Sequence, residues 1–427
     1  MKIAIAGLGY VGLPLARQFV RGGIDVIGLD VDKKKVDTLK AGQTYIKHIP
    51  AEEINEMVSS GHFEPTTDFS SVNGVDAILI CVPTPLSKQR EPDLSYVIAT
   101  AEGIAPHLSK GTLVTLESTT YPGTTDGELR EALEKGSGMT AGVDFYLAYS
   151  PEREDPGNKT SVEAIPKLVG GLTDTCRDRA LEVYRKAIDS IVPVASCRVA
   201  EAAKLTENIF RSVNIAMVNE LKVIFDRMEI DVWDVIDAAA TKPFGYMPFY
   251  PGPGLGGHCI PIDPFYLTWK AREFGKHTRF IELAGEINNS MPEYVITRLG
   301  EALNSVAKPV RNSKILVVGL AYKAGVDDMR ESPSFQLLDL IKNQGGEVSY
   351  YDPYIPEVSP TREHAEWTGA RSITWDAESL SKFDAAIVST DHPDVDYQLL
   401  ADNIEIIIDT RNAFEKAGVT AKSFWKA

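Results

Sequence analysis

Residues 1–12, MKIAIAGLGYVG, decide the fold of this chain. A short apolar run ends in a G-x-G-x-x-G pattern formed by Gly7, Gly9 and Gly12, and a helical pattern follows over residues 12–22. In this order, Gly7 permits a tight turn, Gly9 lets the backbone approach a pyrophosphate, and Gly12 lets the helix pack closely on the strand. The strand, the glycine turn and the helix together predict a dinucleotide-binding βαβ unit.

The ligand expected at this turn is NAD. The helix that opens beside Tyr10 and Val11 would receive the phosphates at its N-terminus. Asp30 ends the next apolar run, and a carboxylate there accepts hydrogen bonds from the ribose hydroxyls and repels the 2′-phosphate of NADP. Lys35 is a further candidate for contact with the ribose, although Lys33 to Lys35 could equally be the solvated start of a helix.

Apolar runs alternate with helical stretches in the first and the last part of the chain. In the first part, strands are expected at residues 2–7, 25–32, 76–83, 112–118, 144–152 and 167–171. In the last part, strands are expected at residues 314–320, 347–352, 384–389 and 405–410. Ser332 and Pro333 are typical of an N-cap and a first helical residue. This alternation predicts doubly wound parallel sheets.

A long helix is expected in the middle of the chain, because residues 200–228 contain no proline or glycine. One face of this helix carries Glu201, Lys204, Asn208 and Arg211. Two interpretations of that face remain open. It could be the solvated stripe of an ordinary amphipathic helix, or a polar stripe that lines a site on a buried helix.

The fold class expected from these patterns is α/β, with two Rossmann-like, doubly wound parallel-sheet domains joined by the long central helix. A loop rich in proline, glycine and aromatic residues follows that helix at residues 242–264, and more helix is expected over about 265–305. We place the domains at residues 1–197, 198–305 and 306–427.

The composition argues against several classes of partner. The 427 residues carry a formal net charge of −16, whereas nucleic acids and anionic membrane surfaces favour a basic protein face. The first residues lack the pattern of a signal peptide or a membrane span, so we expect a cytoplasmic protein. The cysteines show no C-x-x-C spacing, so we expect no metal site and no disulfide framework.

Cys259 is the cysteine most open to chemistry. It lies in the glycine loop GGHCIPID, where few side chains shield it, and Asp263 and Lys204 could tune the thiol. From the spacing alone, a catalytic and a structural Cys259 are equally supported. The other cysteines are expected to be structural: Cys81, Cys176 and Cys197.

The loop that follows residues 314–320 carries Lys323 and Arg330. Open α/β sheets bind ligands on such strand-to-helix loops, and two cations there could bind a diphosphate. They could equally be surface charges on a polar loop.

Seven motifs in chain order resemble those of the UDP-glucose/GDP-mannose dehydrogenase family, over essentially the whole chain. They are GLGYVG with Asp30, VPTP (82–85), ESTT (117–120), SPER (150–153), EAAKLTEN (201–208), PGPGLGGHCIPID (251–263) and GLAYKAGVDDMRESP (319–333). The resemblance implies an N-terminal NAD domain, a central segment at a homodimer interface, and a C-terminal domain that binds the UDP-sugar. It also implies that two successive NAD molecules accept hydrides while a C6 primary alcohol becomes a uronic acid for polysaccharide or glycan precursors.

The resemblance also implies catalytic roles. Cys259 would attack the aldehyde to give a thiohemiacetal, hydride loss would give a thioester, and water would hydrolyse it. Lys204 and Asn208 would stabilise the oxyanion at C6. Asp263 would position or activate water. Further candidates for this last role are Glu152 and Thr119.

Binding roles follow from the same resemblance. Thr84 and Thr119 would contact NAD, and Arg330 would contact its pyrophosphate or nicotinamide side. The substrate would be bound by the loop at 249–254 and by polar residues elsewhere: Phe249, Tyr250, Gly252, Gly254, Glu152, Lys204, Asn208, Arg211 and Lys323.

One position departs from the UDP-glucose branch of that family. The residue before Asp263 is usually lysine in that branch, and here it is Ile262. The motif is more similar to the branch that acts on UDP-N-acetylhexosamines, so we expect UDP-N-acetylglucosamine. The alternatives are UDP-N-acetylmannosamine, UDP-N-acetylgalactosamine and UDP-glucose. An alternative of a different class is a non-catalytic NAD-binding sensor, against which the joint presence of Lys204, Asn208, Cys259 and Asp263 argues.

Overall fold

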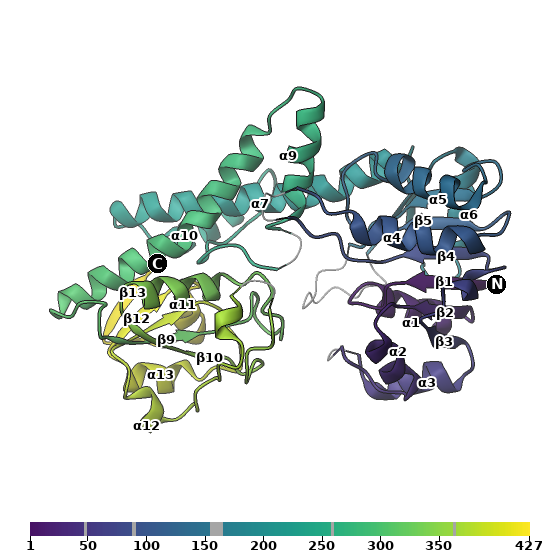
Figure 1. Ribbon diagram of the computed structural model, residues 1–427. Coiled ribbons are helices and arrows are strands. Elements are labelled where there is room, and N and C mark those ends of the chain that lie inside the picture. Colours follow the sequence, from purple (N-terminus) through teal and green to yellow (C-terminus); the bar gives the residue numbers. More distant parts are fainter. Residues whose placement is uncertain (47–48, 88–90, 154–164, 258–259, 362–363) are drawn as a thin grey trace. The chain divides into compact units, whose positions relative to one another are not determined.

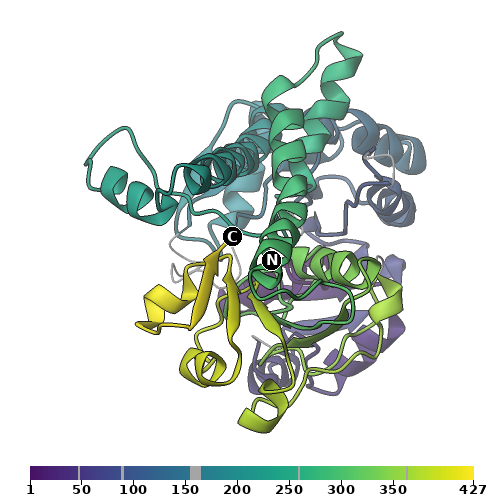
Figure 2. The ribbon, with the colours of Figure 1, turned by 90° about the vertical axis from the view of Figure 1, so that its left-hand side faces the viewer.

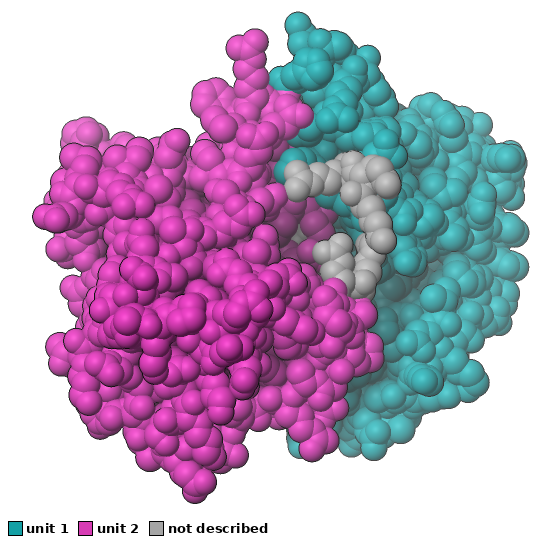
Figure 3. Space-filling model, turned by 60° about the vertical axis from the view of Figure 1, so that its left-hand side comes forward, with its two compact units in different colours: residues 1–207, 265–277 teal, residues 208–264, 278–427 magenta. Residues whose placement is uncertain are grey.

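Two largely parallel sheets organise the protein in the computed structural model (Figure 1). The structure describes residues 1–427 except 47–48, 88–90, 154–164, 258–259 and 362–363. Its internal contacts divide the chain into two compact units, which are coloured separately in Figure 3. The first unit contains residues 1–207 and 265–277, and the second contains residues 208–264 and 278–427. The three-domain division expected from the sequence stays a prediction.

The first unit contains an eight-stranded sheet in the order β3-β2-β1-β4-β5-β6-β7-β8 among the described residues. The strands are β1 (Lys2–Ala6), β2 (Asp25–Leu29), β3 (Phe63–Thr66), β4 (Ala77–Ile80), β5 (Leu113–Leu116), β6 (Tyr146–Tyr149), β7 (Lys167–Gly171) and β8 (Ile191–Pro193). The order reverses between β1 and β4, and open α/β sheets bind ligands at such a point. The expected parallel arrangement holds except at one pair, because β7 runs antiparallel to β6.

Helices cover both faces of this sheet, as the doubly wound pattern predicts. One apolar core joins the sheet to α1 (Gly12–Arg21), α2 (Lys33–Lys40), α3 (Ala51–Ser59) and α6 (Asp174–Tyr184). The core on the other face includes α4 (Ser95–Ile104) and α5 (Arg130–Ser137). On α1, Leu13, Ala16 and Phe19 are fully buried, since residues three or four apart share one side of a helix.

The second unit contains a five-stranded parallel sheet in the order β10-β9-β11-β12-β13. Its strands are β9 (Lys314–Val318), β10 (Glu347–Tyr351), β11 (Ala385–Val388), β12 (Ile406–Asp409) and β13 (Ser423–Lys426). Figures 1 and 2 show β12 and β13 side by side in yellow. The helices of this sheet are α11 (Pro333–Asn343), α12 (Ala377–Leu380), α13 (Tyr397–Asn403) and α14 (Ala413–Ala417). Ser332 caps α11 by accepting a hydrogen bond from the Ser334 amide, which confirms the predicted helix start.

The long central helix is α7 (Cys197–Arg227), close to the expected range. On its polar face, Glu201, Lys204 and Asn208 are buried, whereas Arg211 is exposed. The structure therefore favours the interpretation of a buried polar stripe.

The helical segment after the central helix departs from the sequence expectation. It contains α8 (Val232–Ala240), α9 (Asp263–Glu273) and α10 (Arg279–Ser305). The helix expected over about 265–305 is present as α9 and α10, and it is interrupted where Gly275 takes a left-handed φ of +65°. In the part of the chain that the structure describes, no helix is long and apolar enough to cross a membrane.

A buried carboxylate connects the first turns of α7 to the segment that precedes α5. Glu201 accepts hydrogen bonds from the Gly123 amide at 2.7 Å, the Thr125 amide at 2.9 Å and the Thr125 hydroxyl at 2.7 Å. Burial outweighs these three donors and raises the pKa of Glu201 to about 7. The folded protein therefore takes up a proton that an unfolded chain would release at lower pH.

This group predicts a pH-dependent stability. Its contribution is complete below about pH 4.5 and is lost as the pH rises towards 7, so the free energy of unfolding should fall by on the order of 3 kcal/mol across that window. Glu201→Gln cannot ionise, so its melting temperature relative to the wild type should rise between pH 5 and 8. Exposed Glu131→Gln is the control, and thermal unfolding at constant ionic strength is the measurement. A difference between wild type and Glu201→Gln that stays constant with pH would contradict this reading.

Candidate active site

The turn after β1 has the geometry of an anion-binding site. Gly7 has a φ of +94°, and a Cβ at that position would lie 2.5 Å from the Cys81 carbonyl oxygen. A Cβ at Gly12 would lie 1.8 Å from the Gly7 carbonyl oxygen, whereas a Cβ at Gly9 would meet nothing within 4 Å. No side chain caps α1 at Val11, and no acidic residue lies in its first turn. The backbone beside Gly9 and the start of α1 can therefore face phosphates.

Asp30 lies next to this turn, at the end of β2. Its carboxylate accepts hydrogen bonds from the Leu8 and Asp32 amides, both at 2.9 Å, and lies 3.4 Å from Lys35 Nζ. Tyr45 was not found from the sequence, because no motif marks it. Its hydroxyl donates to the Leu8 carbonyl, and burial together with nearby Asp30 and Asp32 raises its pKa well above the usual value. Lys35 lies 5.9 Å from the centre of the Tyr45 ring.

The carboxyl ends of β4, β5 and β6 carry three of the predicted site residues. The Thr84 hydroxyl donates to the Thr119 carbonyl at 2.7 Å, so the structure brings these two predicted NAD contacts together. Tyr266 on α9, which no motif marks, donates to the Thr84 carbonyl. Glu152 follows β6, and one of its oxygens accepts a hydrogen bond from the Arg153 amide at 2.7 Å.

The buried stripe of α7 carries the predicted oxyanion donors. Lys204 is 7 % exposed and forms no hydrogen bond or ion pair with any residue that the structure describes. Asn208, one turn further along, donates from Nδ2 to Asp263 Oδ2 at 2.5 Å, and Asp263 is 4 % exposed. A buried ammonium group without a counter-ion is costly unless a ligand supplies an oxygen. This is the feature of α7 that most clearly indicates a site.

In the second unit, the glycines of the 251–254 loop are buried beside an arginine. The Gly252 amide donates to Asn219 Oδ1 at 3.0 Å, and a Cβ at Gly252 would lie 2.4 Å from Arg411 Nη1. Arg411 follows β12, and its Nε donates to the Ser389 carbonyl at 3.0 Å. The sequence analysis missed Arg411, although its place just after an apolar strand is the signal that drew attention to Lys323.

The aromatic part of the same loop lies against helices. Phe249 packs edge-on against Phe210 of α7, with 5.6 Å between ring centres. Tyr250 donates to Asp237 of α8 at 2.6 Å, and this hydrogen bond together with burial raises its pKa to about 12. Phe249 and Tyr250 therefore contact α7 and α8, away from the buried glycines of the same loop. Arg211, another predicted substrate contact, is exposed on α7.

The loop after β9 carries the two predicted cations. Lys323 is partly buried. Arg330 is exposed, and its guanidinium binds the Asp328 carboxylate through Nε at 2.8 Å and Nη2 at 2.5 Å. The Gly257 amide donates to the Arg330 carbonyl at 3.2 Å. The backbone just before Cys259 is thus joined to this loop, while His258 and Cys259 lie outside the described residues.

An aspartate ends β10 as Asp30 ends β2. Asp352 accepts hydrogen bonds from the Leu320 amide at 2.7 Å and the Ala321 amide at 2.8 Å, just as Asp30 accepts from Leu8. His392 Nε2 lies 3.0 Å from the same oxygen, and all of Asp352 is buried. Protein groups therefore occupy the Asp352 oxygen that corresponds to the Asp30 oxygen bonded by Leu8.

The three described cysteines, Cys81, Cys176 and Cys197, are buried and free of disulfides. Burial raises the pKa of both Cys81 and Cys197 well above the usual range. Thiols of this kind stay protonated and unreactive, which agrees with the structural role expected for them.

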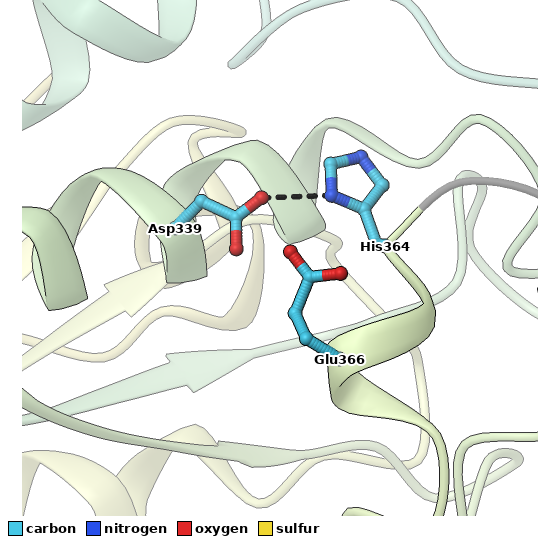
Figure 4. Close-up of side chains that lie close together, drawn as sticks. All are labelled: Asp339, His364 and Glu366. Atoms are coloured by element: carbon cyan, nitrogen blue, oxygen red, sulfur yellow. Dashed lines mark hydrogen bonds and ion pairs between the residues drawn. The ribbon is translucent and has the colours of Figure 1, made fainter.

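One group among the described residues has the composition of a metal site. Asp339, His364 and Glu366 place ligand atoms within 4.8 Å of one another (Figure 4). Both Asp339 oxygens already have partners, His364 Nδ1 and Trp367 Nε1, each at 2.7 Å. His364 also stacks on Phe335 at 5.3 Å. Since the group is stabilised by its own hydrogen bonds, we do not assign a metal to it.

Comparisons with known proteins bear on these features. Three family models match the chain, all from the UDP-glucose/GDP-mannose dehydrogenase family: the NAD binding domain at residues 1–188, the central domain at 198–290 and the UDP binding domain at 316–416. The chain is 35 % identical over 431 residues to the UDP-N-acetyl-D-mannosamine dehydrogenase of Pyrococcus horikoshii, covering 98 % of this chain and 97 % of that protein. It is 36 % identical over 397 residues to the UDP-N-acetyl-D-glucosamine 6-dehydrogenase of Salmonella typhi, covering 92 % and 90 %.

Two solved structures of nucleotide-sugar dehydrogenases match this chain over its whole length. The structure of the Pyrococcus horikoshii UDP-D-ManNAc dehydrogenase matches with a TM-score of 0.88 and 32 % identity, covering 100 % of this chain and 99 % of that one. An NDP-N-acetyl-D-galactosaminuronic acid dehydrogenase from Methanosarcina mazei matches with a TM-score of 0.83 and 30 % identity, covering 100 % and 94 %.

The geometry at Asp30 predicts the choice of cofactor. Asp30→Ala removes the acceptor for the ribose hydroxyls and the charge that repels a 2′-phosphate, so NAD should bind roughly 10- to 100-fold more weakly and the preference over NADP should shrink. Titration of both cofactors measures the effect. Asp37→Ala, an exposed carboxylate on α2, should change neither affinity. Equal use of NAD and NADP by the wild type would show that Asp30 does not select the cofactor.

Proposed function

The chain belongs to the UDP-glucose/GDP-mannose dehydrogenase family, and from this premise we propose that it oxidises the C6 primary alcohol of a UDP-N-acetylhexosamine to a carboxylate. Like the family, it is an NAD-dependent oxidoreductase. The observation that carries the proposal is Lys204, which is buried on α7 without a partner among the described residues, one turn before the Asn208–Asp263 pair. An alkoxide or carbonyl oxygen of the substrate is the missing partner.

The residues around the first turn fit the cofactor. Gly9 leaves its backbone open, the start of α1 has no side-chain cap, and Asp30 lies beside them for the ribose. NAD, when bound there, accepts the hydride in each of the two oxidations. Thr84 and Thr119, joined by their own hydrogen bond, would contact it at the carboxyl ends of β4 and β5.

The second oxidation needs a covalent step. An aldehyde has no readily lost hydride until a nucleophile adds to its carbon, and a Cys259 thiolate would add to give a thiohemiacetal. After hydride loss, the thioester is hydrolysed by water, which regenerates the thiolate. Lys204 and Asn208 would stabilise the oxygen that becomes negative in both the addition and the hydrolysis. The groups that would position water or take up its proton are Asp263, Glu152 and Thr119.

The substrate class rests on the relatives and on one residue. The matched proteins act, by their names, on N-acetylated glucosamine, mannosamine and galactosaminuronic acid nucleotides. Ile262 replaces the lysine that is typical of the UDP-glucose branch. We favour UDP-N-acetylglucosamine over UDP-N-acetylmannosamine, with UDP-glucose as the runner-up. Arg411 and Lys323 would supply positive charge to the diphosphate.

A homodimer is proposed through α7. Phe210, Met217 and Ile224 recur at intervals of seven residues and are 48 %, 43 % and 47 % exposed. Because seven residues make nearly two helical turns, these side chains lie on one face, and a second copy of the helix would cover them.

We expect two NADH for each sugar oxidised, without release of a free aldehyde. Absorbance of NADH measured with a panel of UDP-glucose, the three UDP-N-acetylhexosamines and GDP-mannose gives the substrate and the stoichiometry.

Cys259→Ser should lower turnover by several orders of magnitude, because a hydroxyl stays protonated at neutral pH. Buried Cys176→Ser should keep the two-to-one ratio. Near wild-type turnover by Cys259→Ser would overturn the covalent step, and a higher kcat/KM for UDP-glucose would overturn the substrate.

Light scattering at micromolar concentration should give the mass of a dimer. Met217→Glu would place a charge in the proposed interface and should shift the protein towards monomers. Val143→Glu, at an exposed position in the first unit, is the control. A monomer mass for the wild type would remove this proposal.

A further inference from the structure

A glycine-rich loop lies at the edge of the second sheet where its parallel strands end. A Cβ at Gly252 would lie 2.4 Å from Arg411 Nη1, and a Cβ at Gly254 would lie 3.0 Å from Pro333 Cβ. Arg411 follows β12, and Pro333 begins α11 after β9. The strand order reverses between β9 and β11, and open α/β sheets bind ligands at such a point. The loop is therefore packed tightly at the ligand-binding edge of this sheet.

A chain of buried amides holds the same loop from the helices. The Gly252 amide donates to Asn219 Oδ1 of α7 at 3.0 Å. Asn219 Nδ2 donates to Asn288 Oδ1 of α10 at 2.8 Å, and Asn288 Nδ2 donates to the Ser212 carbonyl at 3.1 Å. The chain of hydrogen bonds thus runs from a backbone donor to a backbone acceptor. Each polar side-chain atom in it has one fixed role.

The burial of this chain needs a reason. Asn219 and Asn288 are 0 % and 1 % exposed, and buried amide groups are costly unless each polar atom has a partner. A pair of apolar side chains would join α7 to α10 without that requirement, but it would leave the buried Gly252 amide unpaired. The asparagine pair therefore serves the position of the loop and not only the contact between the two helices.

Arg411 gives the position of Gly252 a consequence for binding. The Arg411 Nε donates to the Ser389 carbonyl at 3.0 Å, which orients the guanidinium towards the loop. Asp391 and Asp409 attract this cation, but neither forms an ion pair with it. A partly buried guanidinium without a paired carboxylate favours an anionic ligand, and a diphosphate matches its two parallel N–H donors.

We propose that Asn219 and Asn288 are positioning residues that hold the Gly252 peptide against Arg411, so that the loop and the guanidinium form a preformed site for the diphosphate of the sugar nucleotide. The inference rests on the proposed function, which assigns that class of substrate. All four residues belong to the second unit, whereas the NAD binding domain matches residues 1–188. Their effect should therefore fall on the sugar nucleotide and not on NAD.

The test uses the full-length protein and measures the binding of UDP and of NAD separately by calorimetry. Asn219→Leu removes the acceptor of the Gly252 amide and should weaken UDP binding by about tenfold or more, because a buried donor is left unpaired. Asn288→Leu keeps that acceptor but lets the Asn219 side chain turn, so a smaller loss is expected. NAD affinity should not change in either variant. In turnover, KM for the sugar nucleotide should rise while KM for NAD stays constant.

Asn219→Asp separates positioning from folding. Its carboxylate still accepts the Gly252 amide, so it should bind UDP more tightly than Asn219→Leu, whichever of the two melts at the lower temperature. Asn289→Leu, at the exposed neighbouring position of α10, is the control and should leave both affinities unchanged.

Gly252→Ala tests the same contact from the other side and carries the test if the Asn219 variants fail to fold. Its Cβ would displace Arg411 Nη1 and should weaken UDP binding while the amide chain stays intact. Wild-type affinity for UDP in Asn219→Leu or in Gly252→Ala would overturn the inference, and so would an equal loss of UDP and NAD affinity. A wild type that binds NAD but not UDP would instead overturn the proposed function.

Discussion

Parallel pairing of β1 with β2 and β4 is the constraint on which the rest of the first unit depends. Parallel strands all end at one edge of a sheet, and each crossover helix begins near that edge. The glycine turn, Thr84, Thr119 and Glu152 therefore share an edge although up to 145 residues separate them in sequence. The close packing of Gly7 on the chain after β4 holds the turn against this edge, since any side chain there would collide with the Cys81 carbonyl.

The central helix α7 buries several polar side chains, and most of them have hydrogen-bond partners. Glu201 is satisfied by the backbone before α5, Asn208 by Asp263, and Asn219 by the Gly252 amide and Asn288. Each of these groups joins α7 to another segment of its own unit. Lys204 has no such partner among the described residues, and this contrast within one helix is more informative than its burial alone.

The fold was predictable where local chemistry determines structure. The glycine spacing, the cap at Ser332 and the absence of helix breakers over residues 200–228 each predict an element that the structure contains. The short strands β3, β8 and β13 were missed, because two contain proline and the third is only four residues long. The direction of β7 was also missed, since a five-residue apolar run is compatible with either direction.

The site was predictable only in part. Motifs marked Thr84, Thr119, Asn208 and Asp263, and the structure pairs them two by two. Tyr45 and Tyr266 have no local signal that distinguishes them from other aromatic residues, whereas Arg411 lies just after an apolar strand and could have been marked. Their positions depend on which loops the fold brings together, and tertiary proximity is not encoded in spacing.

Asp30 and Asp352, which directly follow β2 and β10, make the same kind of hydrogen bond within each of the two units. In each, the carboxylate accepts the amide of the residue that follows the first glycine of the loop, Leu8 or Leu320. His392 Nε2 also lies 3.0 Å from that Asp352 oxygen, whereas the corresponding Asp30 oxygen lies 3.4 Å from Lys35 Nζ. The same carboxylate-to-amide hydrogen bond therefore holds the loop after the first strand of each sheet, so the loop geometry can persist while the other partners of the carboxylate differ.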